Sequence, residues 1–476
     1  MRHYSIVDRY RYIWVYALMV VSYYTIYYSD LYRVVYPYSD LAADMLLTDE
    51  IYRGVLLTGH YSRFEFHHPG AFFFYLNALC EWLFGSLFPS RANVWLFGSL
   101  LLNALFLTLS IYLAHSILRP QRATPVATLL LSLLLMLLFV GYQDLWMPSR
   151  VVAPYLAYLL TLPLVMRREY RYLPLSMLLS GILIHGYVVL PIMTLPPLVV
   201  ALLYSLLSHP RALDSREWRY LISALLVGGL FLSPMLYDLY LNGTHSNIAK
   251  IIESARDSKP HSSWRETFEF VGMVIPLGSI VSTAILLAMV IYSSSRYRAE
   301  IYRVLSISLV VGAIFVLYHH TAPKPLYEFV GRYIYALPLS IYILLFSMLW
   351  SIDRYGRAVA LMSMVYLLSD QLHISQPYRE YEMTPIVSRS IVDLTPEGRV
   401  AHIDYTNHSD WEVVAALLLE LEREGHEACV VQRHMAFLYT PYRVCQEGDR
   451  ADILLKTKRG GGYSVYSVRY SNTTPR

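Results

Sequence analysis

The chain has 476 residues, of which 56% are hydrophobic and 16% carry a formal charge. Soluble domains carry about 25% charged residues, so this composition excludes an ordinary soluble protein and indicates an integral membrane protein. The net charge of +4 is small, and the arginines fall in short segments between apolar runs, which excludes a nucleic-acid-binding surface. We therefore expect the lipid bilayer, and no nucleic acid, as a partner of this chain.

The first element in chain order is an apolar run from Tyr12 to Tyr28, which follows Arg2, Arg9 and Arg11. No small-residue cleavage site comes after it, which is typical of a retained signal anchor with its N-terminus in the cytoplasm. Apolar runs long enough to span a bilayer are Ile13–Tyr28, Val94–Ile117, Val126–Tyr142, Val151–Met166, Leu173–Leu206, Leu221–Leu239, Phe270–Tyr292, Val304–Tyr318, Tyr333–Trp350 and Ala358–Leu372. The run 173–206 is long enough for two short helices with a turn near His185.

One further apolar run, Ala71–Phe88, decides the topology. If it does not cross, every later arginine cluster lies on the side of the N-terminal arginines, as the positive-inside rule requires. Glu81 also argues against crossing, because a carboxylate at the bilayer centre costs about 2.5 kcal/mol or more. We expect a helix in the outer interface, about 11 spans, a cytoplasmic N-terminus and an outer C-terminus. The clusters are Arg119/Arg122, Arg167/Arg168/Arg171, Arg211/Arg216/Arg219, Arg296/Arg298/Arg303 and Arg354/Arg357.

The composition changes after the last apolar run, and the sequence predicts two domains. Residues 1–374 form a multi-span membrane domain, and residues 375–476 form a soluble extracytoplasmic α/β domain. Cys429 and Cys445 can form a disulfide if this region is extracytoplasmic, or remain two unpaired small residues. The soluble domain is predicted to contain strands at Val400–Asp404, Ala428–Gln432, Asp452–Lys456 and Ser464–Arg469, and an amphipathic helix at Asp410–Arg423.

A polar loop at 30–70 interrupts the apolar sequence on the outer side. Asp40 and Asp44 are spaced one helical turn apart, so both carboxylates can lie on one face of a helix. A carboxylate there can accept a proton from a hydroxyl group or hold a metal ion. Alternatively, Asp40 caps the helix and Asp44 is solvated.

The same loop ends in a segment rich in arginine and histidine, from Gly59 to Gly70. Arg63 can bind a phosphate through its guanidinium fork, or extend to the lipid headgroups. Adjacent residues point apart, and no further ligand has zinc-like spacing, so His67 and His68 are not expected to form a metal site. We expect His68 to present its imidazole to a polar ligand.

Three further residues are candidate ligands of a substrate on the outer face. These residues are Asp144, His185 and Arg332. Each also has a structural interpretation: Asp144 as a turn residue, His185 as a hydrogen-bonded turn residue, and Arg332 as the anchor of a helix end.

The arrangement resembles the GT-C glycosyltransferase superfamily, in particular a bacterial subgroup with a His-Pro-Gly run and similarity to arabinofuranosyltransferases and aminoarabinose transferases. An acidic residue after the first span is the mark of the superfamily, and Asp40 matches it. The run from Gly59 to Gly70 matches the subgroup, although Ala71 stands where a second proline is usual. The turn holding Asp144 resembles the second outer loop of the superfamily. The segment Gly331–Tyr333 resembles the arginine-tyrosine segment that opens a late span.

The resemblance implies a polytopic α-helical enzyme that transfers a sugar from a polyprenyl-phosphate carrier to a glycan, protein or lipid acceptor on the outer face of the inner membrane. Asp40 is then the general base, and Arg63, His68 and Arg332 supply positive charge or hydrogen bonds to the phosphate. The substrate-binding set is Asp44, Arg63, His67, His68, Asp144, His185 and Arg332. No cofactor is certain, and a divalent cation is possible. Asp404, His408 and Trp411 are the expected acceptor contacts of the soluble domain.

Two other functions stay open at this point. A transporter or flippase for a lipid-linked sugar would show repeat symmetry and charges deep within its spans, and the sequence shows neither. A polymerase or ligase of lipid-linked saccharides would use a large late outer loop, for which 238–267 is the candidate.

Overall fold

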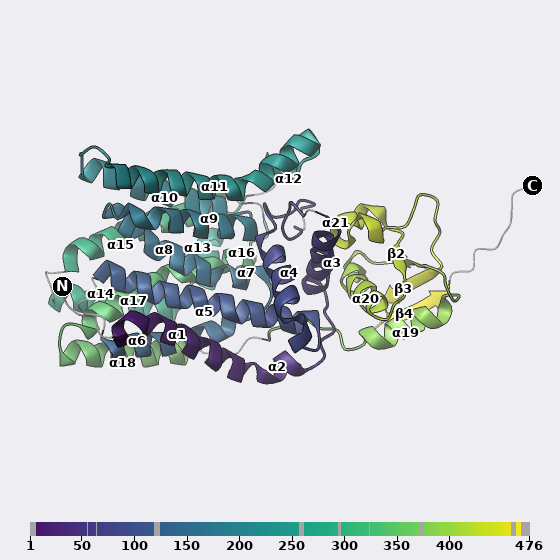
Figure 1. Cartoon of the computed structure of the whole chain (residues 1–476), viewed down its shortest axis with the longest axis horizontal. Helices are drawn as coiled ribbons and strands as arrows, with labels where there is room; N and C mark the ends of the chain where they lie inside the picture. The colour runs from purple at the N-terminus through teal and green to yellow at the C-terminus, as the bar shows by residue number, and fades with distance from the viewer. Residues whose placement is uncertain are drawn as a thin grey trace, which may run out of the picture.

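The computed structural model describes residues 6–54, 56–62, 64–118, 124–256, 261–293, 297–322, 324–371, 376–457 and 463–467. Figure 1 shows an elongated molecule with a helical bundle at one end and a small mixed α/β domain at the other. The bundle contains α1 (Ile6–Ile26), α5 (Arg91–Leu118), α6 (Pro125–Phe139), α8 (Val152–Met166), α9 (Leu173–Gly186), α10 (Leu190–Ser208), α11 (Ser215–Asn242), α14 (Leu277–Ser293), α15 (Arg298–Thr321), α17 (Ala336–Trp350) and α18 (Arg354–Gln371). Every apolar run predicted to span the membrane is therefore helical.

Seven described helices are long and apolar enough to cross a membrane, or eight if α14 and the preceding α13 (Trp264–Val274), bent by 79°, form one span. Three further bundle helices are not long or apolar enough to be assigned as membrane spans by length and composition alone. Helix α1 begins with charged residues, α9 has only 14 residues, and α18 carries charges near both ends. Figure 1 shows these three running with the others, so the multi-pass helical membrane fold is confirmed.

Helix α4 (Phe72–Phe84) corresponds to the run predicted not to cross. Its 13 residues rise about 20 Å, less than the ~30 Å hydrocarbon core. It lies at the end of the bundle that faces the soluble domain (Figure 1). Glu81 is paired there, since Arg91 Nε lies 3.0 Å away and Tyr52 donates a 2.7 Å hydrogen bond.

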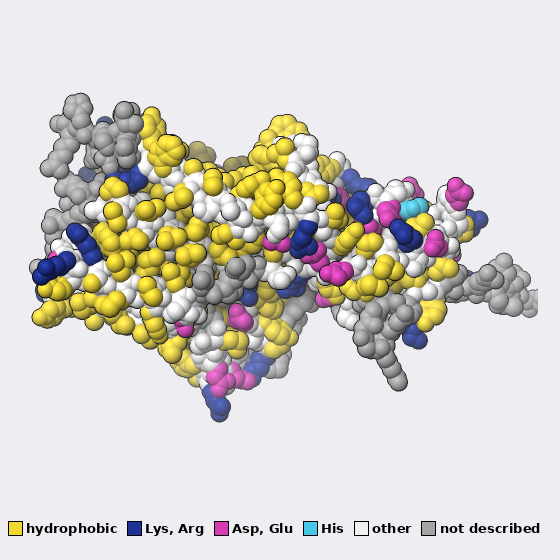
Figure 2. All heavy atoms as spheres, turned by 90° about the horizontal axis from the view of Figure 1, so that it is seen from below, with side chains coloured by type: hydrophobic (Ala, Val, Ile, Leu, Met, Phe, Trp, Pro, Cys, Tyr) yellow, Lys and Arg dark blue, Asp and Glu magenta, His cyan; other side chains and the backbone are white. Residues whose placement is uncertain are grey.

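The opposite end of the bundle gathers arginines from separate connections. Arg167 donates a hydrogen bond to the carbonyl of Ile117, and Arg168 donates to the carbonyl of His209 and pairs with Glu217. Figure 2 shows dark blue side chains at this end and a broad hydrophobic surface along the bundle. Arg119, Arg122 and Arg296 lie outside the described residues.

The soluble domain has a four-stranded sheet in the order β2-β1-β3-β4. Strand β1 (Ala401–Tyr405) is parallel to both β2 (Ala428–Val430) and β3 (Ile453–Thr457), whereas β4 (Tyr463–Ser467) is antiparallel to β3. Helices α19 (Thr384–Leu394), α20 (Trp411–Arg423) and α21 (Ala436–Tyr439) accompany the sheet. The four strands and the predicted helix are present, whereas α19 and α21 were not predicted. Cys429 and Cys445 form a disulfide, which settles the open question in favour of pairing.

Helix α3 (Asp40–Arg53), from the segment between the first bundle helix and α4, connects the two parts of the molecule. Its residues Ala42, Ala43 and Leu46 are buried in the same hydrophobic core as β1, β3 and α20. Alternate residues of β1 and the apolar face of α20 are buried in this core, and α3 packs against α20 and α21, beside which it lies in Figure 1. The soluble domain therefore holds a helix that comes from the membrane domain's sequence.

A buried arginine fixes this packing. Arg443 is 2% exposed and donates to the Leu46 carbonyl at 3.2 Å, to Asp49 at 2.6 Å and to Glu422 at 2.7 Å. Asp49 also pairs with Arg91 of α5 at 2.8 Å. A chain of ion pairs thus runs from the soluble domain through α3 to the bundle.

The segment after the last bundle helix adds backbone contacts to the same region. Tyr38 donates its backbone N–H to the carbonyl of Arg379, and Leu145 donates to the carbonyl of Pro377. Arg33 forms a bidentate ion pair with Glu380, with N–O distances of 2.7 and 2.5 Å. Residues 377–380 are therefore bound to both the first loop and the turn that carries Asp144.

Replacing Arg443 by methionine is expected to destabilise this junction by about 3 kcal/mol, because Asp49 and Glu422 would lose a buried partner. The thermal unfolding midpoint of the detergent-solubilised protein measures this effect. Arg433→Met is the matched control, because Arg433 is half-exposed and pairs with the exposed Glu447 at 3.5 Å, and such pairs contribute little. Equal midpoints for the two variants would contradict the role of Arg443.

Candidate active site

Two cavities meet at the end of the bundle that lies next to the soluble domain. The polar chamber has a volume of about 220 Å³, and the apolar chamber has a volume of about 610 Å³. Asp40, Asp44 and Trp146 line both chambers. The polar chamber is also lined by Asp144, Gln376, Arg332 and Arg379, and the apolar chamber by Phe64, Phe66, Tyr187, Ile192, Leu326 and Phe329.

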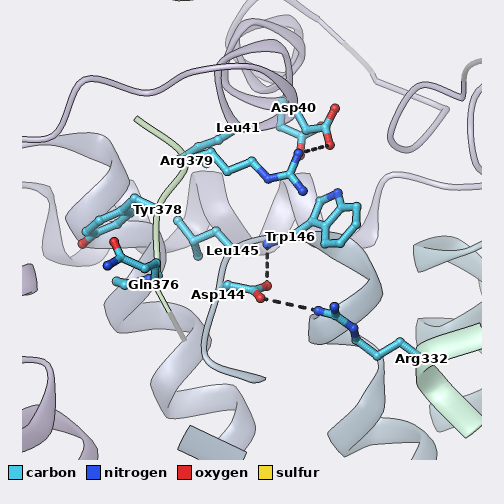
Figure 3. A pocket seen from close by; sticks show the side chains of 11 residues that line it. Asp40, Leu41, Asp144, Leu145, Trp146, Arg332, Gln376, Tyr378 and Arg379 are labelled. Atoms are coloured by element: carbon cyan, nitrogen blue, oxygen red, sulfur yellow. Dashed lines mark hydrogen bonds and ion pairs between the residues drawn. The ribbon is translucent and has the colours of Figure 1, made fainter. Parts of the chain in front are cut away.

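Asp40 is the first residue of α3 and lies where the chambers meet. Ser39 precedes it with a φ of 57°, an uncommon backbone conformation for a residue with a side chain, and its N–H is bound by the carbonyl of Glu412 at 3.3 Å. One Asp40 oxygen accepts a hydrogen bond from Tyr61, and the other lies 3.4 Å from Arg379 (Figure 3). A carboxylate held by a phenol and an arginine is oriented, and its side chain remains 25% exposed to the cleft.

Asp44 lies one turn later, is 5% exposed, and contacts Nδ1 of His60 at 2.7 Å. Burial raises the pKa of Asp44, because the charged form loses water, and the neighbouring His60 opposes that effect. The spacing of Asp40 and Asp44 does place both on the cleft side of α3, as the sequence predicted.

Asp144 lies on the far side of the polar chamber. Its carboxylate accepts hydrogen bonds from the Trp146 backbone N–H at 3.1 Å and from the Ser149 hydroxyl at 2.9 Å. Arg332 lies 3.8 Å from the same carboxylate and donates to Ser149 at 3.0 Å (Figure 3). Burial raises the pKa of Asp144, and the Ser149 hydrogen bond and Arg332 oppose the rise.

The indole of Trp146 separates the two carboxylate-arginine pairs. The guanidinium of Arg379 lies 4.3 Å from the ring centre and that of Arg332 lies 5.5 Å away. Figure 3 shows Asp40 with Arg379 on one side and Asp144 with Arg332 on the other. Acid, cation and aromatic groups therefore alternate across the chamber, and both arginines have an aromatic neighbour suited to cations.

The His-Pro-Gly segment folds back on itself beside α3. The His68 N–H donates to the carbonyl of His60 at 2.7 Å, and Gly59 donates to His68 at 2.9 Å. A Cβ atom at Gly59 would lie 2.5 Å from the carbonyl oxygen of Gly70, so only glycine permits this close approach. His60 and His68 both line the apolar chamber as a result.

The other predicted site residues lie farther from the cleft surface. His67 donates from Nδ1 to the carbonyl of Gly59 at 3.0 Å and does not line either chamber. His185 donates from Nε2 to Phe231 at 2.7 Å and packs against Gly70, whose Cβ would lie 2.3 Å from its ring. Arg63 lies outside the described residues.

Several site residues were not identified from the sequence. His60 and Trp146 had nearby signals, because His60 lies in the same loop as Arg63 and Trp146 lies in the same turn as Asp144. Arg379 had no such signal in the sequence, because it follows the last span and comes close to Asp40 only in the folded chain. Of the soluble-domain candidates, Trp411 packs its ring 5.3 Å from Tyr61, whereas Asp404 binds Gln432 at 2.9 Å. The side chain of His408 is outside the described part of the chain.

The described chain contains one group of three possible metal ligands within 4.8 Å of one another, made of His402, Cys429 and Cys445. The two cysteines are bonded to each other, which removes their thiolates as ligands. The described carboxylates of the chambers do not form such a group. Each of Asp40 and Asp144 faces an arginine instead.

The structure is similar to ArnT from Cupriavidus metallidurans bound to undecaprenyl phosphate, with a TM-score of 0.53, 14% sequence identity, and coverage of 94% of this chain and 93% of that chain. The archaeal oligosaccharyltransferase AglB from Archaeoglobus fulgidus, in complex with an inhibitory peptide and a dolichol-phosphate, has a TM-score of 0.44 and 10% identity over 92% of this chain and 65% of that chain; no conclusion rests on that likeness. No protein-family model and no curated protein matches the sequence. The ArnT likeness extends over nearly the whole of both chains and confirms the predicted fold, a polytopic helical membrane domain followed by a small α/β domain.

Stability is expected to fall with acid because His68 is buried and neutral. Burial, together with His60 and His67, lowers its pKa to about 3. The folded state therefore binds the proton less tightly than the unfolded chain does. Stability is complete above the ordinary pKa of about 6.5 and declines below it, by about 2 kcal/mol at about pH 5.

The measurement is the thermal midpoint between about pH 7.5 and pH 5. His68→Asn keeps an acceptor for the Val188 N–H, which His68 Nδ1 accepts at 3.1 Å, and is expected to show a flatter pH dependence. His426→Asn is the control, because His426 is exposed on the soluble domain. If His68→Asn keeps the slope of the unmodified protein, the buried neutral imidazole does not explain acid sensitivity.

Proposed function

We propose that this protein is a glycosyltransferase that moves a sugar from a polyprenyl-phosphate carrier to a glycan, protein or lipid acceptor, with Asp40 as general base. The observation that carries the proposal is the meeting of an apolar and a polar chamber at Asp40. A lipid-linked sugar has an apolar chain and a polar head, and its acceptor presents a hydroxyl group. The cleft offers a surface suited to each.

The apolar chamber suits the carrier. Aromatic and aliphatic side chains line it, and one of them, Ile192 of α10, is 42% exposed, which suits entry of an apolar chain from the side of the bundle. The fold likeness to a protein bound to undecaprenyl phosphate supports a ligand of this class. Burial of prenyl carbons stabilises binding by about 0.8 kcal/mol for each CH₂ group.

The polar chamber suits the acceptor. The acceptor oxygen attacks the anomeric carbon while Asp40 takes the hydroxyl proton. The bond from that carbon to the phosphate oxygen breaks, and its electron pair leaves with the phosphate. Arg332 and Arg379 line the chamber and are suited to stabilise the negative charge of the leaving phosphate.

The remaining predicted residues have roles that follow from their positions. Asp44 and Asp144 orient neighbouring groups of the cleft, and His68 contributes to the wall of the apolar chamber. His67 and His185 support the His-Pro-Gly segment through backbone contacts. We retain Arg63 as a phosphate ligand on the sequence argument alone.

We propose that the site and the soluble domain lie on the outer face of the inner (plasma) membrane. The arginines gather at the end of the bundle away from the site, which is the cytoplasmic end under the positive-inside rule. A disulfide in the soluble domain suits the oxidising side of the membrane. The soluble domain then orients the acceptor, with Trp411 as its nearest predicted contact to the Asp40 partner Tyr61.

Replacing Asp40 by asparagine tests the assignment in membranes supplied with labelled polyprenyl-phosphate sugars. We expect transfer to fall by about 10²- to 10⁴-fold, the usual contribution of a positioned base. Asp393→Asn is the isosteric control, because Asp393 is exposed on α19.

A chelator tests the role of a divalent cation in the same assay. Since Asp40 and Asp144 already face arginines, we propose that no divalent cation takes part, and a chelator should leave transfer unchanged.

Transfer at the normal rate by the Asp40→Asn variant would refute the base assignment. Product analysis separates the other functions. A single added sugar supports the proposal, whereas a polymer or an unaltered lipid moved across the bilayer would replace it with a polymerase or a flippase. Loss of transfer with the chelator would show that a divalent cation is required.

A further inference from the structure

A buried histidine that the proposed mechanism does not use lies beside the catalytic helix. His60 is 7% exposed, and its Nδ1 contacts Asp44 at 2.7 Å. No described residue forms a hydrogen bond with its Nε2. A buried polar atom without a partner costs free energy, commonly about 1–3 kcal/mol. His60 differs from the other buried histidines of this kind in that it lines the apolar chamber beside Asp44.

The position of His60 is set by the chain around it. Hydrogen bonds between the two arms of the 59–68 loop place His60 next to His68. The ring of His60 packs 4.5 Å from that of Phe74 on α4. Loop, α3 and α4 therefore fix the imidazole on three sides.

The two histidines have different hydrogen-bonding states. His68 accepts the Val188 N–H at Nδ1, so its ring proton is on Nε2. His60 directs Nδ1 at the Asp44 carboxylate, which leaves Nε2 as the ring nitrogen available to a ligand. Asp44 thereby orients the ring, as the orienting carboxylate of a catalytic histidine does.

We propose that His60, held by Asp44, donates a hydrogen bond from Nε2 to a phosphate oxygen of the lipid carrier in the apolar chamber. This inference rests on the proposed function and names a phosphate ligand of the same site. The ligand class is a phosphate ester on an apolar chain, because the chamber wall combines these two imidazoles with aromatic and aliphatic side chains. His60 forms no covalent bond and stabilises the phosphate as it leaves.

Two substitutions separate Nε2 from Nδ1. In His60→Asn the amide can replace Nδ1 at Asp44 and nothing replaces Nε2, whereas in His60→Gln the amide reaches the position of Nε2. The probes are undecaprenyl phosphate and undecaprenol, which lacks the phosphate, added to the solubilised full-length protein. We expect His60→Asn to weaken phosphate binding about 10- to 100-fold, with no change for the alcohol, and His60→Gln to weaken it less.

A matched control is His115→Asn. His115 is 3% exposed, binds Tyr12 through Nδ1, and likewise has no described partner at Nε2, but it lies in the last turn of α5 away from the cleft. It should bind both probes normally. Thermal midpoints of all variants show whether each is folded.

Normal phosphate binding by folded His60→Asn would overturn the inference, as would a greater loss in His60→Gln than in His60→Asn. The second result would mean that contact with Asp44, and not Nε2, matters. If the unmodified protein bound undecaprenyl phosphate no better than undecaprenol, the proposed function itself would fail, and this inference with it. The proposed function stands if the unmodified protein prefers the phosphate and His60→Asn does not alter that preference.

Discussion

The site depends on the packing of α3 between the bundle and the soluble domain. One face of the helix, with Ala42, Ala43 and Leu46, completes the core of the soluble domain, while Asp40 and Asp44 on another face line the cleft. An amphipathic helix of 14 residues is marginally stable by itself. Its tertiary contacts therefore determine where the two carboxylates lie, and the soluble domain is part of the active-site structure.

Charge balance is the second constraint. Buried charges without a partner are costly. Asp40 with Arg379 and Asp144 with Arg332 form two pairs on either side of Trp146. Under the proposed function, a lipid phosphate that enters the cleft would meet these two arginines, which line the polar chamber.

Much of the architecture could be predicted because it follows from local patterns. Hydrophobic run lengths identified the bundle helices, and alternation identified the four strands. The membrane orientation inferred from the arginine positions stays a prediction. The spacing of Asp40 and Asp44 predicted a shared face. The pairing of Arg379 with Asp40 and the contacts of Arg443 with α3 could not be predicted. They join segments hundreds of residues apart, and the periodicity of a sequence carries no information on such contacts. His185 was chosen as a ligand for its unusual setting in an apolar run, but packing against Gly70 accounts for that setting.

The central claim is that a polyprenyl phosphate binds where the two chambers meet. An experimental structure of the protein in lipid nanodiscs with undecaprenyl phosphate tests it most directly. The account predicts density for the prenyl chain along Phe66, Tyr187 and Leu326 in the apolar chamber, with the phosphate at the junction beside Asp40 and His60. A lipid phosphate bound at the arginine-rich opposite end of the bundle, with both chambers free of lipid, would contradict it.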